Sequence, residues 1–156
     1  MAVALAVPAM TTGCGGPGGG TDPTSVVKKA QSLAQETLDA VRPTAGSAAT
    51  SVEGGGWEKC PAGEPGPDRF SYSYGLRLDV PKDASRPVLD AAKAHFVEAG
   101  YTLDAPDSTV ARVGGTLPRS HWWVGVGVQN ESSMFISTGS GCLPMSSDPR
   151  SDGADR

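Results

Sequence analysis

The sequence predicts a single α+β domain in which an antiparallel β-sheet carries two helices on one face and is closed by one disulfide. Three observations lead to this prediction. Two segments repeat apolar residues at helical spacing, and several others alternate apolar and polar residues as strands do. Two cysteines also lie on either side of the strand-rich region. Helices that cover one face of an antiparallel sheet define the α+β class.

Composition and charge limit the classes of partner. The chain has 156 residues and a formal net charge of -4. Its densest basic pair is Lys28-Lys29, so we expect no nucleic-acid binding, which needs a clustered basic surface. No apolar run is long enough to predict a membrane-spanning helix. We expect a signal peptide remnant at 1–13, a flexible lipidated tether at 14–21, a monomeric domain at 22–145 and a disordered tail at 146–156.

The first residues resemble a bacterial export signal of the lipoprotein type. Residues 1–10 are apolar, and Thr11-Thr12-Gly13-Cys14 follows at once. Such a lipobox needs small residues for the peptidase and a cysteine thiol that accepts the diacylglyceryl group. Thr11 departs from the usual leucine, and no basic residue precedes Lys28, which fits a start codon assigned too far downstream. The alternative is a short N-terminus with an incidental cysteine.

The three cysteines are Cys14, Cys60 and Cys142. If Cys14 carries lipid, the other two form a matched pair, and an oxidising compartment favours a disulfide between them. A metal site or a catalytic thiol is the alternative, but neither cysteine has a second cysteine or a histidine at ligand spacing. We therefore expect a structural disulfide, no metal and no cofactor.

The first helix is predicted from Asp22, its cap, through Pro23 to Arg42-Pro43, where it ends. Its apolar side lacks tryptophan and phenylalanine, so packing on the sheet is favoured over lying on a membrane. Residues 44–53 predict a weak strand that runs into Gly54–Trp57, and a Pro/Gly loop occupies 60–68. Residues 70–80 alternate strictly, which predicts a half-buried antiparallel strand with an aromatic and aliphatic core face.

The second helix is predicted over Ser85–Gly100, with Ser85 as its cap and Gly100 as its left-handed stop. Its expected buried stripe is Val88, Leu89, Ala92, Phe96 and Ala99. Strands are then expected at 101–104, 109–113, 122–129 and 134–138.

Two glycines, Gly125 and Gly127, share one face of the strand at 122–129 with Trp123. Glycine weakens a strand unless something approaches the backbone closely. Either a helix crosses that face or a ligand groove lies beside Trp123. The candidate ligand or partner surface is therefore formed by Trp57, Trp123 and His121.

The order of these features resembles the actinobacterial LppA/LppV-like small envelope lipoproteins. The resemblance falls on Cys14, a tryptophan shortly before a cysteine (Trp57 and Cys60), Gly100 at the end of a helix, and Cys142 near the C-terminus. It implies an envelope lipoprotein, lipid-anchored on the extracytoplasmic face of the cell membrane, with a disulfide-closed α+β domain. It implies no defined activity.

Catalytic motifs are absent from the sequence. Gly139-Ser140-Gly141 lacks the frame of a nucleophile elbow, and His121 has no predicted acidic partner. The carboxylates of Glu58, Glu64 and Asp68 share one loop, where acids are usually solvated. We expect a non-catalytic module that binds an envelope protein or a small apolar ligand. The alternatives are a secreted hydrolase-like enzyme, marked by a deep pocket with convergent titratable groups, and a cytosolic protein with reduced cysteines.

Overall fold

The computed structural model describes residues 21–151 except 47, 62, 64–67 and 108. Cys14 and the expected signal and tether, apart from Thr21, therefore lie outside the described residues. The elements, in chain order, are α1 (Pro23–Ala45), β1 (Ala49–Lys59), β2 (Arg69–Asp79), α2 (Ser85–Glu98), β3 (Thr102–Leu103), β4 (Arg112–Thr116), β5 (Trp123–Asn130), β6 (Ser133–Gly139) and β7 (Leu143–Pro144). Among the described residues, no helix has the length and apolar composition to cross a bilayer.

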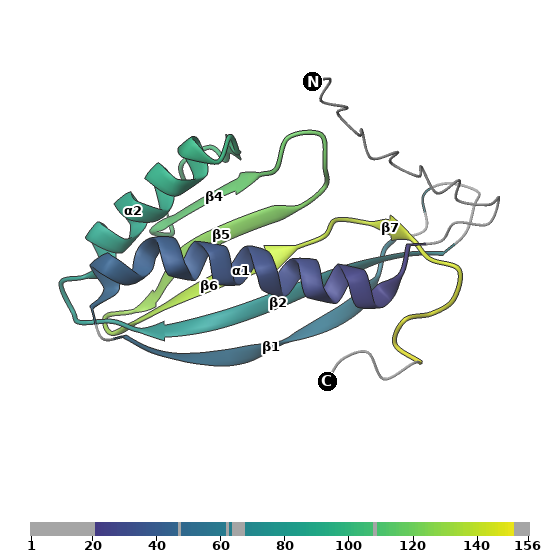
Figure 1. Cartoon of the computed structure of the whole chain (residues 1–156), viewed down its shortest axis with the longest axis horizontal. Helices are drawn as coiled ribbons and strands as arrows, with labels where there is room; N and C mark the ends of the chain where they lie inside the picture. The colour runs from purple at the N-terminus through teal and green to yellow at the C-terminus, as the bar shows by residue number, and fades with distance from the viewer. Residues whose placement is uncertain (1–20, 47, 62, 64–67, 108, 152–156) are drawn as a thin grey trace, which may run out of the picture.

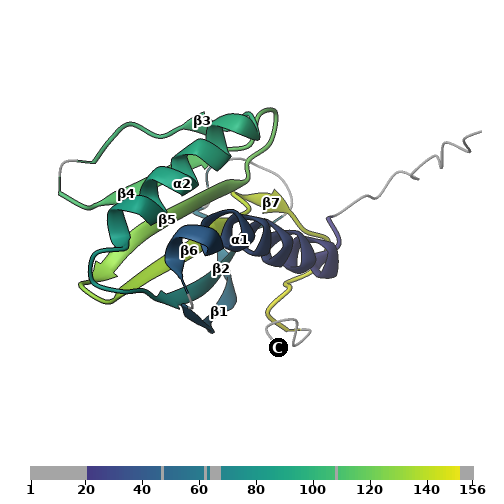
Figure 2. The ribbon, with the colours of Figure 1, turned by 60° about the vertical axis from the view of Figure 1, so that its left-hand side comes forward.

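The strands form one antiparallel sheet with the order β1-β2-β6-β5-β4-β3, and the short β7 pairs with β2 beyond the end of β6. Both helices lie on the same side of this sheet (Figures 1 and 2). Helix α1 packs over β2 and β6, while α2 packs over β3, β4 and β5 and against α1. The expected α+β class is therefore confirmed, including the two helices on one face.

Helix α1 forms as its sequence predicts. The Asp22 carboxylate accepts a hydrogen bond from the Ser25 backbone N–H at 2.9 Å, and Pro23 occupies the first turn, where its missing N–H costs nothing. The helix continues to Ala45, past the predicted end at Pro43. Its buried stripe faces the sheet and consists of Val26, Ala30, Leu33, Ala34, Thr37, Leu38, Val41 and Ala45.

Helix α2 corrects two details of the prediction. Ser85 is the first helical residue and not the cap, since Ala84 occupies that position without a side-chain hydrogen bond. Ala99 is exposed, because the helix ends at Glu98 and the chain turns away. Gly100 does adopt the predicted left-handed conformation, with φ at +78°. Val88, Ala92 and Phe96 are fully buried.

Strand β2 has the predicted alternation, with Phe70, Tyr72, Leu76 and Leu78 buried toward the helices. Strand β1 is longer than expected, because its whole length to Lys59 pairs with β2. It is also the edge of the sheet, and Trp57 is its only buried residue. Cross-strand pairing thus extends the strand through glycines whose own strand propensity is poor.

Strand β4 lies later in the sequence than the predicted segment 109–113. The Asp107 carboxylate accepts hydrogen bonds from the backbone N–H of Thr109, at 2.8 Å, and from its hydroxyl. This local turn removes Thr109 and Val110 from the sheet. The strand begins at Arg112 and includes Gly114 and Gly115, which face glycine and valine on β5.

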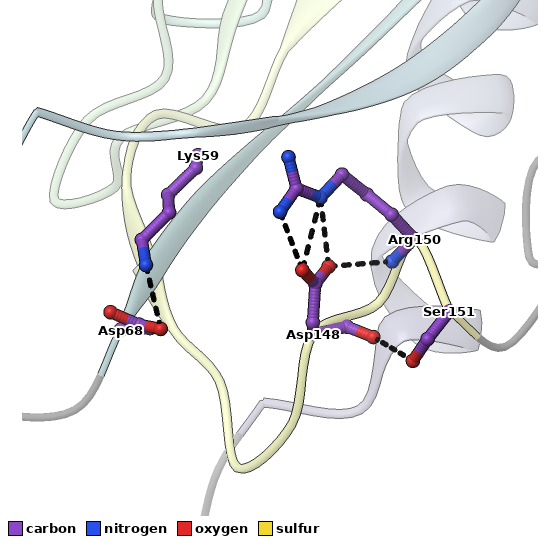
Figure 3. A network of polar contacts seen from close by, with 5 residues as sticks. All are labelled: Lys59, Asp68, Asp148, Arg150 and Ser151. Carbon is purple, nitrogen blue, oxygen red and sulfur yellow. Dashed lines mark hydrogen bonds and ion pairs between the residues drawn. The ribbon is translucent and has the colours of Figure 1, made fainter.

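The packed part of the chain extends past residue 145, where the domain was expected to end. Met145 and Pro149 are buried, and the Arg150 guanidinium lies over the Phe70 ring at 5.4 Å from its centroid. Asp148 accepts hydrogen bonds from the Arg150 side chain and backbone, which folds this segment back on itself (Figure 3). The expected tail at 146–156 is thus wrong for residues 146–151; residues 152–156 lie outside the described range.

The predicted disulfide joins Cys60 to Cys142, with an S–S distance of 2.01 Å. Cys60 follows β1 and Cys142 follows β6, two strands that flank β2 and run in the same direction. The bond therefore connects segments 82 residues apart in the sequence across the same end of β2.

Candidate ligand-binding site

The face of the sheet opposite the helices, called the open face below, combines many small residues with two aromatic rings and two arginines. The register sets Arg77, Phe135, Gly127 and Arg112 in one row across β2, β6, β5 and β4. The next row holds Gly75, Ser137, Gly125 and Gly114, and the row after it holds Ser73, Gly139, Trp123 and Thr116. The half-buried rings of Trp123 and Phe135 therefore have mostly small residues around them.

The Trp123 ring lies against the sheet because its neighbours Gly125 and Gly114 have no side chains. A Cβ on Gly125 would stand 2.4 Å from the indole Cη2 atom, and one on Gly114 would stand 2.9 Å from Cζ2. The indole Nε1–H donates to the Asp104 carboxylate at 2.6 Å. Asp104 is itself fixed by its backbone N–H, which donates to the Gly114 carbonyl at 2.9 Å.

The glycine pair of β5 is thereby explained. A Cβ on Gly127 would stand 2.5 Å from the Phe135 ring, just as one on Gly125 would meet Trp123. The expectation that a helix crosses this face is wrong, since both helices pack on the other side. What approaches the backbone closely is a pair of aromatic rings from the sheet itself.

A cavity of about 360 Å³ lies between α2 and the edge formed by β3 and β4, and its lining includes Asp104 and Gly114, which also contact or adjoin Trp123. This α2–β4 cavity has apolar walls from Leu89, Leu103 and Val113, all half-buried. The loop residues Ala105 and Pro106 complete the lining. Its volume is at the lower end of the range for small-molecule pockets, which is roughly 300–1,000 Å³.

Four charged side chains line the same cavity, and all four are exposed at its mouth. Helix α2 contributes Asp90 and Lys93, and the sheet edge contributes Asp104 and Arg112. Asp104 thus belongs both to the cavity and to the support of Trp123. Gly114 and Arg112, which also line the cavity, belong to rows of the open face.

The charged groups at the mouth differ in how they are held. Within the described part of the chain, Asp90 and Lys93 make neither an ion pair nor a hydrogen bond through their side chains. Arg112 has only a long contact to Asp107, at 3.8 Å between Nη2 and Oδ2. Hydrogen bonds from Thr109, more than Arg112 itself, lower the pKa of Asp107, so this carboxylate stays ionised beside the guanidinium.

The candidate residues from the sequence do not form one site. Trp57 is only 6% exposed and packs against Tyr72, with ring centroids 5.0 Å apart, so its placement on a ligand surface is wrong. His121 is exposed in a separate hollow of about 320 Å³, lined by the disulfide and by Arg69. None of the three lines the α2–β4 cavity, although Trp123 donates a hydrogen bond to Asp104, which does.

Two further expectations concern acidic and metal-binding residues. Asp68 of the Pro/Gly loop forms an ion pair with Lys59 at 2.8 Å (Figure 3), while Glu64 lies outside the described residues. Within the described ranges, no group of three or more histidine, cysteine or acidic side chains is arranged to hold a metal ion. The residues missed by the sequence are Asp90, Lys93, Asp104 and Arg112, which carry no motif and meet only after folding.

Comparisons with known proteins identify a solved structure with a similar fold. No protein-family model matches the sequence, and no curated protein matches it significantly. Among solved structures, the chain is similar to a DUF4853 family protein from Actinomyces odontolyticus, with a TM-score of 0.52 and 16% identity. The match covers 76% of this chain and 68% of the other. At this identity the likeness shows the fold alone: this α+β architecture has a counterpart in an actinobacterial protein.

Proposed function

We propose that this protein is an exported, lipid-anchored binding module that takes a small ligand in the α2–β4 cavity. The observation that carries the proposal is the cavity itself. It has apolar walls, a charged mouth, and a shared residue, Asp104, that links it to the Trp123 indole at 2.6 Å. Ligand sites commonly combine an apolar lining with a few placed polar groups.

The cellular address rests on the cysteines. The disulfide between Cys60 and Cys142 supports an oxidising compartment, where such bonds persist. Pairing these two leaves Cys14 as the odd cysteine, at the position that resembles a lipobox. We propose that Cys14 carries the lipid and holds the domain at the extracytoplasmic face of the membrane.

Binding is favoured over catalysis by the position of the charges. A general acid or base works best where burial and neighbouring groups tune its pKa. The four charged side chains of the cavity are exposed, and its interior walls are apolar. Charged groups at the mouth of an apolar cavity suit the orientation of a ligand.

A fragment-binding experiment tests the site. The full chain is mixed with small apolar fragments, and methyl shifts of Leu89, Leu103 and Val113 are followed by NMR. Two variants fill the cavity, Leu89→Trp on α2 and Ala105→Trp on the exposed loop. The matched control is Val97→Trp, since Val97 is 60% exposed on α2 and does not line the cavity. Binding should survive in the control and vanish in both filled variants; equal binding in all three would contradict the proposal.

A separate experiment tests the anchor. The intact mass and membrane association of the protein from its native cell are compared with those of Cys14→Ser. The control is the double variant Cys60→Ser with Cys142→Ser, which removes the disulfide and should keep the lipid. A mass that differs only by the exchange of sulfur for oxygen, together with unchanged partition in Cys14→Ser, would remove lipid anchoring from the proposal without affecting the cavity.

A further inference from the structure

The mouth of the α2–β4 cavity carries two acids and two bases, and each wall supplies one of each. Asp90 and Lys93 come from α2, while Asp104 and Arg112 come from the sheet edge. A ligand of one charge sign would meet two like charges at this mouth. A neutral apolar ligand would cover four charged groups without replacing the water they lose, which costs free energy.

Among the described residues the two charges of α2 have no partner, whereas each charge of the sheet edge has one: Arg112 has a long contact to Asp107 at 3.8 Å, and Asp104 is hydrogen-bonded to Trp123. Asp90 and Lys93 are three residues apart on one helix, a spacing that commonly allows an ion pair. No such pair forms between them among the described contacts, although six ion pairs form elsewhere in the described chain. On the opposite wall, Asp104 Oδ2 accepts from Trp123, which fixes the carboxylate.

The apolar walls determine what lies between the two charges of the ligand. Leu89, Leu103 and Val113 are half-buried against the core and keep part of their surface in the cavity. Covering that surface with an apolar side chain is favourable, by about 25 cal/mol per Å² buried. The volume of about 360 Å³ limits the ligand to a small molecule.

We infer that the α2–β4 cavity binds a small zwitterion with an apolar side chain, namely a free amino acid or a short peptide with both termini free. The ammonium group of the ligand pairs with Asp90 or Asp104. Its carboxylate pairs with Lys93 or Arg112, and its side chain lies on the leucine and valine walls. This inference rests on the binding function proposed above, and it names the chemical class of the ligand.

The test titrates the full chain with the dipeptide Ala-Leu and with its N-acetylated, C-amidated and doubly capped forms. Each cap removes one charge and keeps the apolar side chain. Affinity is measured by calorimetry, and the site by NMR shifts of Leu89 and Val113. We expect the free dipeptide to bind, each single cap to weaken binding about three- to tenfold, and the double cap to weaken it further.

Charge variants of α2 connect each terminus to its partner. Lys93→Gln should weaken binding of the free dipeptide about three- to tenfold and leave binding of the C-amidated form unchanged. Asp90→Asn should weaken binding of the free dipeptide to the same extent and leave binding of the N-acetylated form unchanged. The matched controls are Arg86→Gln and Glu98→Gln, which remove the same charges from exposed positions of α2 outside the cavity. Both controls should bind like the wild type, which excludes an effect of net charge.

The remaining outcomes separate this inference from the proposed function. If all four dipeptide forms bind equally at the cavity, recognition of a zwitterion is wrong and the binding function stands. If none of them binds while the apolar fragments do, the ligand class is again overturned and the cavity keeps its function. If neither dipeptides nor fragments bind, both proposals fall.

Discussion

Replacing Gly125 with alanine tests why the open face is built on glycine. The new Cβ would stand 2.4 Å from Cη2 and 2.6 Å from Cζ2 of Trp123, so the ring must swing away from the strand. That movement breaks the hydrogen bond from the indole N–H to Asp104, worth about 1 kcal/mol at a partly exposed site. Displacing a packed ring costs about 1–3 kcal/mol more.

Alanine also has a favourable effect, because it loses less backbone entropy than glycine on folding. This offsets the cost by about 0.5–1 kcal/mol. The free energy of unfolding of Gly125→Ala should therefore fall by about 1–3 kcal/mol, measured by urea denaturation. The matched control is Gly139→Ala on the same face, where a Cβ meets nothing within 4 Å. That variant should be neutral or slightly more stable.

A double-mutant cycle tests whether the ring of Trp123 causes the loss of stability. In the Trp123→Ala background the ring is gone and only the favourable effect of alanine remains, which gives a coupling energy of about 2–4 kcal/mol. If Gly125→Ala costs the same with and without the ring, the ring contact is not the cause. If it is as well tolerated as Gly139→Ala, the proposed close packing of Trp123 is wrong.

Three further predictions follow from the disulfide and from two titrating groups. Replacing both Cys60 and Cys142 with serine should lower the free energy of unfolding by about 4 kcal/mol, because the disulfide closes a long loop. Denaturation without reductant measures this loss, and a loss below about 1 kcal/mol would contradict the prediction. Hydrogen bonds from Arg150 lower the pKa of Asp148 to about 2 from 3.8. The contribution of this carboxylate to stability is therefore present above pH 3.8 and is lost as the pH falls toward 2. Carboxyl NMR should show the pKa of Asp148 rising in Arg150→Ala, and no change would refute the pairing. Burial, and then the charge of Glu36, raise the pKa of Tyr101 above 10.0, so unfolding titrations should show stability falling as the pH rises above 10, less so in Tyr101→Phe.

The amino-acid sequence by itself determined the elements whose signal is local. Asp22 and Pro23 start α1, Gly100 ends α2, and the alternation from Phe70 along β2 appears in the structure as predicted. These signals depend on capping, on φ and on side-chain periodicity within a few residues, so the neighbours in sequence suffice. The cysteine count similarly predicted the bond between Cys60 and Cys142.

The tertiary structure alone decided which side chains share a site. Trp57 and Trp123 look alike in the sequence, yet one is enclosed beside Tyr72 and the other lies on the open face with one edge held by Asp104. The sequence did flag Gly125, but the close neighbour proved to be Trp123, two residues away on the same strand. The indole is held by a hydrogen bond to Asp104, which lies 19 residues away and outside β5, so the strand alone does not specify this contact.

The α2–β4 cavity is the clearest case. Lys93 lies on a helix and Asp104 follows a two-residue strand, and neither segment carries a binding motif. They line one cavity because α2 packs on the sheet beside its short edge strand, which leaves part of the apolar wall uncovered. The periodicity of the sequence determined which face of each element is buried. The space left between those faces depends on how far each element extends and where its neighbours end, and only the packed structure specifies that.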